Sequence, residues 1–196
     1  MKKTAFWLAA ASVMIYLGAS AAAQTPPAPA AAPAAAPALA VEQQHGDWVV
    51  RCLDAQSIGP CDILHVALNR ESGLRVLSIS FAYLPHNDIY VLQMVLPLGV
   101  AIDKGATLAA GDQTLSGLAY SRCERDGCYI EIGVPPALVQ ALSTLGESTT
   151  ITIYSYSPEA AISLPLALTG FAAAAAQMRE QAIQRAVAPP APAPAQ

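Results

Sequence analysis

Charged side chains are scarce in this sequence. Lysine, arginine, aspartate and glutamate together make up 12% of its 196 residues, with 10 basic against 14 acidic side chains and a formal net charge of −4. Lys2 and Lys3 lie before an apolar N-terminal stretch, so the rest of the chain is more acidic still. An acidic surface repels phosphate backbones and anionic lipids. We therefore expect no nucleic-acid partner.

Motifs for catalysis or for cofactor binding are also missing. The three histidines, His45, His65 and His86, lie in different segments without an HExxH or HxxxH spacing, so a metal site is not predicted. No GxSxG precedes a helix, and neither GxGxxG nor GxxxxGK[ST] occurs. We expect a non-enzymatic protein without a cofactor. An unrecognised hydrolase or a carrier of a small apolar ligand remains an alternative, because a sequence does not reveal a pocket.

The N-terminus has the pattern of an export signal. Lys2 and Lys3 precede an uncharged apolar stretch at 5–17, and small residues follow up to Ala23. This order is typical of a signal peptide, here covering residues 1–23 with cleavage after Ala23. The alternative is a retained anchor, because the uncharged segment approaches the ~20 residues that span a bilayer. We expect export to the periplasm, with at most peripheral membrane association.

Proline and alanine dominate two further segments, 24–40 and 188–196, which contain no charged or aromatic residue. Such segments bury too little surface to offset their conformational entropy, which predicts a disordered tether and a disordered tail. The remaining residues, 41–187, are enough for one domain around one core.

Strand patterns fill most of this domain. Short segments rich in β-branched and aromatic residues alternate with Gly, Pro, Asn and Asp turns at 47–53, 62–68, 74–83, 88–96, 114–122, 128–132, 149–156 and 161–168. They predict an all-β sandwich of about eight strands. In the segment 88–96, one face carries the apolar set Tyr90, Leu92, Met94 and Leu96, typical of a strand packed hardest on one side. Trp48 is expected to anchor the core rather than stack on a ligand.

Two helices are predicted within the sandwich. The first, at 135–145, begins with proline, repeats leucine on one face and stops at Gly146. We expect it to cap one end of the domain. The second, at 171–187, has Phe171, Ala175, Met178 and Ala182 at helical spacing. We favour a C-terminal helix lying on the domain over a small-residue interface for a partner.

The four cysteines, Cys52, Cys61, Cys123 and Cys128, are expected to form structural disulfides in an oxidising compartment. Three pairings are possible. We favour Cys52–Cys61 and Cys123–Cys128, because a hairpin loop at 124–127 places the second pair on directly opposed strand positions. A zinc site fits less well, since the spacings miss the usual C-x₂-C pattern.

Two carboxylates, Glu124 and Asp126, lie on this predicted hairpin tip. We favour solvated turn residues over an acid/base dyad at this position, because Asp is a common turn residue.

Several segments, taken in order, resemble the invasion-associated locus B family of exported bacterial proteins. They are GDWVVRC at 46–52, CDIL at 61–64, LPLGV at 96–100 followed by Gly105, YSRCERDGC at 120–128 and LPLALTGF at 164–171. Together they span nearly the whole domain. His65 departs from the pattern, where glutamine is more usual, and both Pro/Ala segments lie outside it.

The resemblance implies an immunoglobulin-like β-sandwich in the periplasm or at the outer membrane, and, for the founding members, a contribution to host-cell entry. It supplies no catalytic residue, and many relatives occur in bacteria that do not invade cells. Our leading hypothesis is a non-enzymatic envelope domain that binds a protein or another envelope component. A chaperone-like module that pairs with a donated strand is a further alternative, which requires an exposed, flat edge strand.

Overall fold

The computed structural model describes residues 39–53, 61–146 and 148–187, all within one compact unit at 36–196. The predicted signal peptide, the tail and nearly all of the tether lie outside the described residues. Within the described ranges, no helix is long and apolar enough to cross a membrane.

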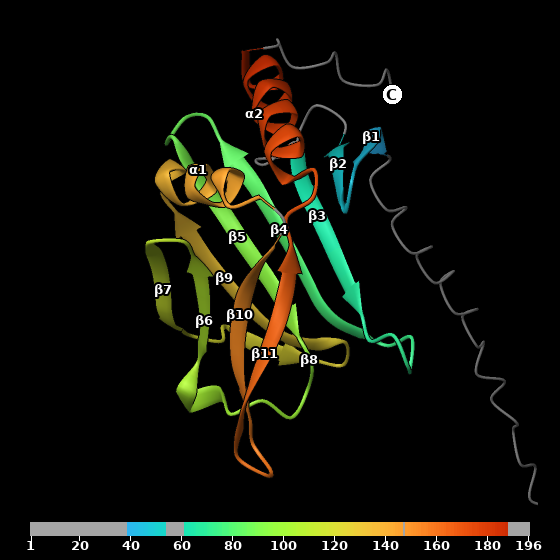
Figure 1. Cartoon of the computed structure of the whole chain (residues 1–196). Coiled ribbons are helices and arrows are strands. Elements are labelled where there is room, and N and C mark those ends of the chain that lie inside the picture. Colours follow the sequence, from blue (N-terminus) through green and yellow to red (C-terminus); the bar gives the residue numbers. More distant parts are fainter. Residues whose placement is uncertain (1–38, 54–60, 147, 188–196) are drawn as a thin grey trace, which may run out of the picture. The chain divides into compact units, whose positions relative to one another are not determined.

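Two antiparallel sheets form the domain (Figure 1). The larger sheet has seven strands in the order β1 (Leu39–His45), β2 (Trp48–Leu53), β3 (Cys61–Leu68), β4 (Arg75–Leu84), β5 (Ile89–Leu96), β9 (Gly127–Val134) and β8 (Arg122–Glu124). The smaller sheet has four strands in the order β11 (Ala160–Ala167), β10 (Ser148–Ser155), β6 (Ala106–Ala110) and β7 (Gln113–Leu118). The predicted all-β sandwich is confirmed, and each predicted strand overlaps an observed one.

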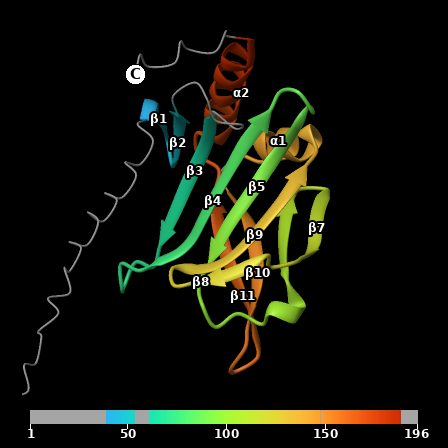
Figure 2. The same cartoon turned by 180° about the vertical axis from the view of Figure 1, so that it is seen from behind.

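One face of the larger sheet is covered and the other is open. The smaller sheet and the two helices, α1 (Pro136–Thr144) and α2 (Phe171–Val187), lie over the same face of the larger sheet (Figure 1). From behind, no described element covers the opposite face (Figure 2). A single turn of 3₁₀ helix, η1 (Ile102–Lys104), leads into β6.

The core lies between these layers and follows the period of the strands. Along β2, buried and partly buried side chains alternate without exception, and β4 repeats the pattern. On β5, the predicted buried face is confirmed, because all four of its apolar side chains are buried. The largest side chains that are fully buried are Trp48, Phe81, Phe171, Ile63, Leu77, Ile79, Leu92, Met94, Leu96, Leu108, Ile130 and Leu138.

Both predicted helices are present at nearly the expected positions. Proline occupies the first turn of α1, where a missing N–H costs nothing, and Leu138 and Leu142 face the core. The helix α2 contacts β1, β2, β3, β4 and α1, and its buried stripe is made of Phe171, Ala174, Ala175, Met178 and Ala182. The small alanine side chains let the helix lie close to the sheet. The prediction of a C-terminal helix lying on the domain is confirmed.

Trp48 joins the two sheets to α2. Its indole Nε1 donates to the carbonyl oxygen of Ala167 on β11 at 3.0 Å, and its ring meets Phe171 edge-on at 4.8 Å between centroids. Beside it, the backbone N–H of Asp47 donates to the carbonyl oxygen of Thr169 at 3.0 Å. The segment 46–52 and the segment 164–171, both part of the family resemblance, therefore meet in space. Trp48 is the core anchor that the sequence predicts.

Both favoured disulfides are present. Cys52 and Cys61 lie opposite each other on β2 and β3, with Cα atoms 4.0 Å apart. Cys123 and Cys128 are opposed on β8 and β9, with Cα atoms 3.9 Å apart. The predicted hairpin loop is corrected in length: Glu124 pairs with Gly127, so the loop is only residues 125–126. The strand pairing continues one residue pair beyond the disulfide, up to the turn.

Candidate functional site

The three histidines do not converge. His65 is buried on β3, where its Nδ1 lies 2.8 Å from the carbonyl oxygen of Asp47 and its ring packs 5.4 Å from that of Trp48. His45 contacts Gln177 of α2, whereas His86 is exposed in the turn between β4 and β5. Histidine at position 65 thus braces the turn that leads into β2. Among the described residues, no group of three or more potential ligands could hold a metal ion.

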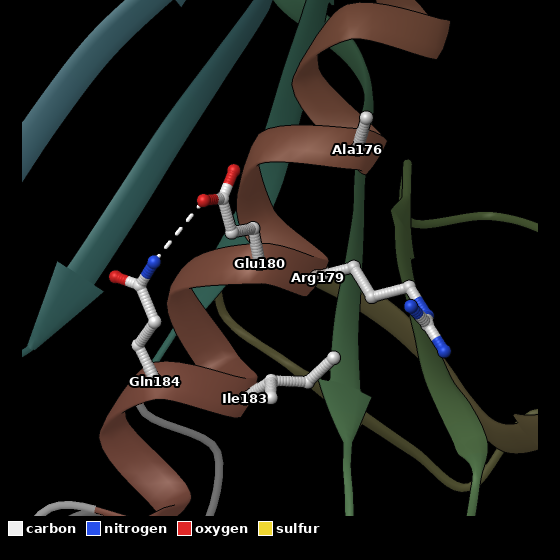
Figure 3. Close-up of a pocket in the computed structure, with 5 residues that line it drawn as sticks. All are labelled: Ala176, Arg179, Glu180, Ile183 and Gln184. Atoms are coloured by element: carbon white, nitrogen blue, oxygen red, sulfur yellow. Dashed lines mark hydrogen bonds between the residues drawn. The ribbon is translucent and has the colours of Figure 1, made fainter.

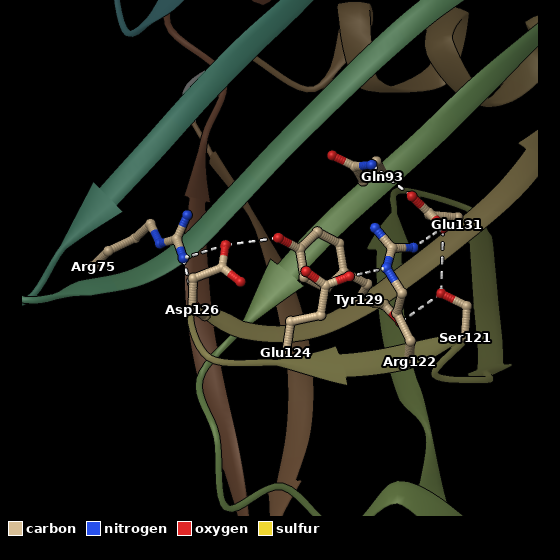
Figure 4. A network of polar contacts seen from close by, with 8 residues as sticks. All are labelled: Arg75, Gln93, Ser121, Arg122, Glu124, Asp126, Tyr129 and Glu131. Carbon is tan, nitrogen blue, oxygen red and sulfur yellow. Dashed lines mark hydrogen bonds and ion pairs between the residues drawn. The ribbon is translucent and has the colours of Figure 1, made fainter. Parts of the chain in front are cut away.

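Glu124 and Asp126 belong to a polar network on the open face of the larger sheet (Figure 4). Arg122 donates to Glu124 through Nε at 2.6 Å and also pairs with Glu131. Asp126 accepts a hydrogen bond from the hydroxyl of Tyr129 at 2.6 Å and forms an ion pair with Arg75 at 3.5 Å. Glu124, at the end of β8, and Asp126, in the turn, are both exposed. They contact different partners and do not contact each other in a dyad.

The partners of Asp126 and Glu131 keep these two carboxylates ionised. The hydrogen bond from Tyr129 holds the pKa of Asp126 below its usual value, and hydrogen bonding from Arg122 does the same for the pKa of Glu131. A general acid at neutral pH requires the opposite shift. The geometry therefore favours a structural surface network over the acid/base dyad.

A concave surface lies between the two helices. This groove has a volume of about 420 Å³, with Tyr90 of β5 at its base, Val139 and Ser143 on the α1 side, and Ala172 and Arg179 on the α2 side. A second hollow of about 480 Å³ runs along α2 past Glu180, Ile183 and Gln184 (Figure 3). The two hollows share Ala176 and Arg179. Arg179 thus stands at the junction of both.

Arg179 is oriented by aromatic contacts. Its guanidinium carbon lies 5.0 Å from the ring centroid of Tyr83, and Nη2 donates to the Tyr83 hydroxyl at 3.5 Å. That hydroxyl in turn donates to Oδ1 of Asp88 at 2.7 Å. Figure 3 shows the Arg179 side chain extending away from Glu180, which instead bonds to Gln184. A stacked guanidinium is held in place while its remaining N–H groups stay available.

The groove carries a positive charge that no described carboxylate pairs with directly; the nearest acidic link is Asp88, through the Tyr83 hydroxyl. The hydrogen bond to Asp88 raises the pKa of Tyr83, and burial raises the pKa of Tyr90, so both phenols stay neutral at physiological pH. Among the described side chains that line the groove between the helices, only Arg179 is formally charged. No described carboxylate lies within ion-pair distance of it.

This arrangement can bind a carboxylate that stands next to small apolar groups. The guanidinium offers planar donors for the anion, and the alanine and valine side chains offer an apolar wall. No sequence motif marks this site. Its parts come from β4, β5, α1 and α2, and the position of Arg179 off the buried stripe of α2 was the one available signal.

Comparisons with known proteins agree with the fold and with the motifs. The chain is 25% identical over 134 residues to the invasion protein B homologs of Brucella abortus strain 2308 and of biovar 1 strain 9-941, covering 68% of this chain and 76% of each relative. The crystal structure of invasion associated protein B from Bartonella henselae is similar, with a TM-score of 0.63 and 19% identity over 72% of this chain and 97% of that one. The family described as invasion associated locus B (IalB) protein matches residues 48–179, and the chain belongs to this family.

Proposed function

We propose that this chain is a non-enzymatic binding domain of the bacterial cell envelope, and that the groove between α1 and α2 takes an acidic, apolar-flanked segment of another envelope protein. The observation that carries the proposal is Arg179, a stacked guanidinium that forms no direct ion pair among the described residues and stands beside an apolar groove. A carboxylate from a partner supplies the missing counterion. The open shape of the groove favours a protein segment over an enclosed small ligand.

Two lines of support bear on the compartment. The leader at 1–23 has the pattern of an export signal, and both cysteine pairs of the domain are disulfide-bonded. Disulfides persist in the periplasm and at the cell surface, whereas they are rare in the cytoplasm. The relatives are named as invasion proteins, and we extend the proposal to a contribution of this binding to host-cell interaction.

The binding proposal is tested with the purified mature protein as bait for envelope proteins of the same bacterium. The wild type, Arg179→Gln and Arg125→Gln are compared; Arg125 is also an exposed arginine and lies in the β8–β9 turn. We expect a set of captured proteins that Arg179→Gln loses and Arg125→Gln keeps. Capture that is equal for both variants, or no specific capture at all, contradicts the proposal.

The compartment is tested by the intact mass of the protein from fractionated cells, measured without reduction after alkylation of free thiols. We expect the mass of the chain cleaved after Ala23, with no alkylated cysteine. A full-length chain with four alkylated thiols in the cytoplasmic fraction contradicts export.

A further inference from the structure

The strand β11 forms one edge of the smaller sheet. It pairs with β10 on one side, and no described strand pairs with it on the other (Figure 1). Residues 160–163 are exposed, and the strand Ala160–Ala167 contains no charged residue. A free edge presents unpaired N–H and C=O groups, and most natural edges are protected by charges, bulges or proline.

The register shows which backbone groups of β11 point outward. Tyr156 donates its N–H to the carbonyl of Gly99, and Tyr154 accepts from the N–H of Ala101, both at 2.8 Å. These two bonds lie on the side of β10 that faces η1 and β6. Because backbone direction alternates along a strand, Ile153 and Ser155 point toward β11.

Ile153 and Ser155 are paired with Ile162 and Ala160, which therefore point toward β10. By the same alternation, the backbone groups of Ala161, Ser163 and Pro165 point outward.

Two further residues agree with this direction and limit the open stretch. The indole of Trp48 donates to the carbonyl of Ala167, which by the same alternation also faces outward. Pro165 has no N–H, and proline in a sheet is tolerated where that N–H would face solvent. One end of the edge is thus closed by Trp48 and Pro165. The backbone groups of Ala161 and Ser163 remain open.

A second copy of the same edge complements this stretch. In an antiparallel arrangement with the two-fold axis at Ile162, Ala161 faces Ser163 of the second copy, and each such pair exchanges two backbone hydrogen bonds. The absence of charge on β11 removes like-charge repulsion between copies. By contrast, the edge strand β8 carries Arg122 and Glu124.

Side chains also favour self-pairing. Ile162 is 40% exposed although it is a large apolar residue, and it lies on the proposed axis, where it meets its own copy. Tyr156, in the turn of the same hairpin, is a second large exposed side chain, at 76%. Ala161 and Ser163 are small enough to let two strands approach to the usual spacing of about 4.8 Å.

We propose that two copies of this chain associate through β11, so that their smaller sheets become one continuous sheet across a two-fold axis at Ile162. The contact is short, and the dimer is therefore weak and concentration-dependent. The inference does not depend on the helix groove.

The test uses a single added thiol. The native cysteines are all in disulfides, so Ile162→Cys introduces one reactive group. Directly opposed residues between two hydrogen-bonded pairs have Cα atoms about 4.5 Å apart, which suits a disulfide. We expect Ile162→Cys to form a covalent dimer under mild oxidation. The matched control is Ile183→Cys on α2, where the isoleucine is 37% exposed, and it should stay monomeric.

A second variant separates edge pairing from random collision. Ser163→Pro removes an outward N–H and leaves the bonds to β10 intact, as Pro165 already does. In the Ile162→Cys background, Ser163→Pro should abolish the crosslink. Ser163→Lys, which adds charge to the edge, should also abolish it and serves as the substitute variant if the proline variant does not fold.

Sedimentation velocity of the wild type should show a mass that rises toward the dimer with concentration, and a loss of this rise in Ser163→Lys. Three outcomes overturn the proposal: Ile183→Cys crosslinks equally, the crosslink survives both edge variants, or the wild type stays monomeric at all concentrations. The last outcome is also the one expected if a foreign peptide, and not a second copy, pairs with β11.

Discussion

Gly46 and Gly170 lie so close together that neither position has room for a side chain. A Cβ atom on Gly170 would stand 2.9 Å from the backbone nitrogen of Gly46 and would overlap the carbonyl group of His45. A Cβ atom on Gly46 would in turn stand 2.8 Å from the carbonyl carbon of Thr169. This backbone contact fixes the turn between β1 and β2 against the start of α2.

Gly170→Ala should therefore destabilise the domain strongly. Its φ of +84° disfavours a side chain, and the added methyl group meets backbone atoms that have little freedom to move. We expect a loss of about 2 to 4 kcal/mol in the free energy of unfolding, measured with urea. Gly73→Ala is the matched control, because Gly73 has a φ of +67° but open space around it. The control should lose only about 1 kcal/mol. Equal losses would show that φ alone decides.

Tyr120→Phe should be tolerated or stabilising at neutral pH. The Tyr120 hydroxyl is buried and has no hydrogen-bond partner among the described residues. Removing an unsatisfied hydroxyl is expected to change the free energy of unfolding by zero to about +1 kcal/mol. A clear decrease in the free energy of unfolding would mean that the Tyr120 hydroxyl has a hydrogen-bond partner. Urea unfolding at pH 7 measures the difference.

Because of Tyr120, we also expect the stability of the domain to fall at alkaline pH. Burial raises the pKa of its phenol from 10.0 to about 12. In the unfolded chain the phenol ionises first, so stability is complete below pH 10 and is lost as the pH rises toward about 12. Tyr120→Phe should weaken this pH dependence, whereas Tyr156→Phe, a change at an exposed tyrosine, should not. Unfolding curves across this pH range, with phenolate absorbance, provide the comparison.

The network on the open sheet face predicts a small loss of stability in acid. The pKa values of Asp126 and Glu131 lie below the ordinary 3.8 and 4.5. As the pH falls, these carboxylates take up protons in the unfolded chain before they do so in the folded protein. The stabilisation by the network is therefore complete above pH 4.5 and is lost as the pH falls past the lower pKa values of the folded state.

Glu131→Gln should reduce the slope of stability against pH below 4.5, and the total stability lost in acid should shrink by at most about 1 kcal/mol, because the pair is exposed. Glu71→Gln, at a carboxylate without an ion pair among the described residues, should keep the wild-type slope. A steeper slope in Glu131→Gln would refute the role of the network.

The two disulfides should differ in access to a reductant. Cys123 is exposed at the β8–β9 hairpin, whereas Cys52 and Cys61 are buried. Mild reduction of the folded protein, followed by alkylation and mass spectrometry, should label Cys123 and Cys128 first. The Cys52–Cys61 bond should open only near the unfolding transition. Simultaneous labelling of all four cysteines under native conditions would contradict this order.

Much of the fold could be predicted from local patterns, and the missed strands have local reasons. The strand β6 (Ala106–Ala110) is rich in alanine, which has no preference for strands, and β8 (Arg122–Glu124) is too short for a period to show. The strand β1 begins at Leu39, so the last two residues of the Pro/Ala segment 24–40, expected to be disordered, belong to a strand. These three segments are strands because a neighbouring strand offers them a hydrogen-bonding edge.

The candidate site could not be predicted in the same way. Arg179 and Tyr83 are far apart in the sequence, and neither belongs to a motif. Their contact depends on the angle at which α2 crosses the sheet, which the alanine-rich packing of the helix sets. The disulfides could be predicted because opposed strand positions follow from a hairpin, and a hairpin is a local feature.

The chain enters and leaves the described domain at neighbouring points. Leu39, at the start of β1, pairs with Leu53, and Arg185, near the end of α2, donates to the carbonyl oxygen of Leu53 at 2.9 Å. A short linker can therefore close residues 39–187 into a ring, and new termini can be opened in the exposed turn at Gly73, where the surroundings are empty. Such a circular permutant keeps every strand pairing of the domain while moving its points of attachment to the opposite end.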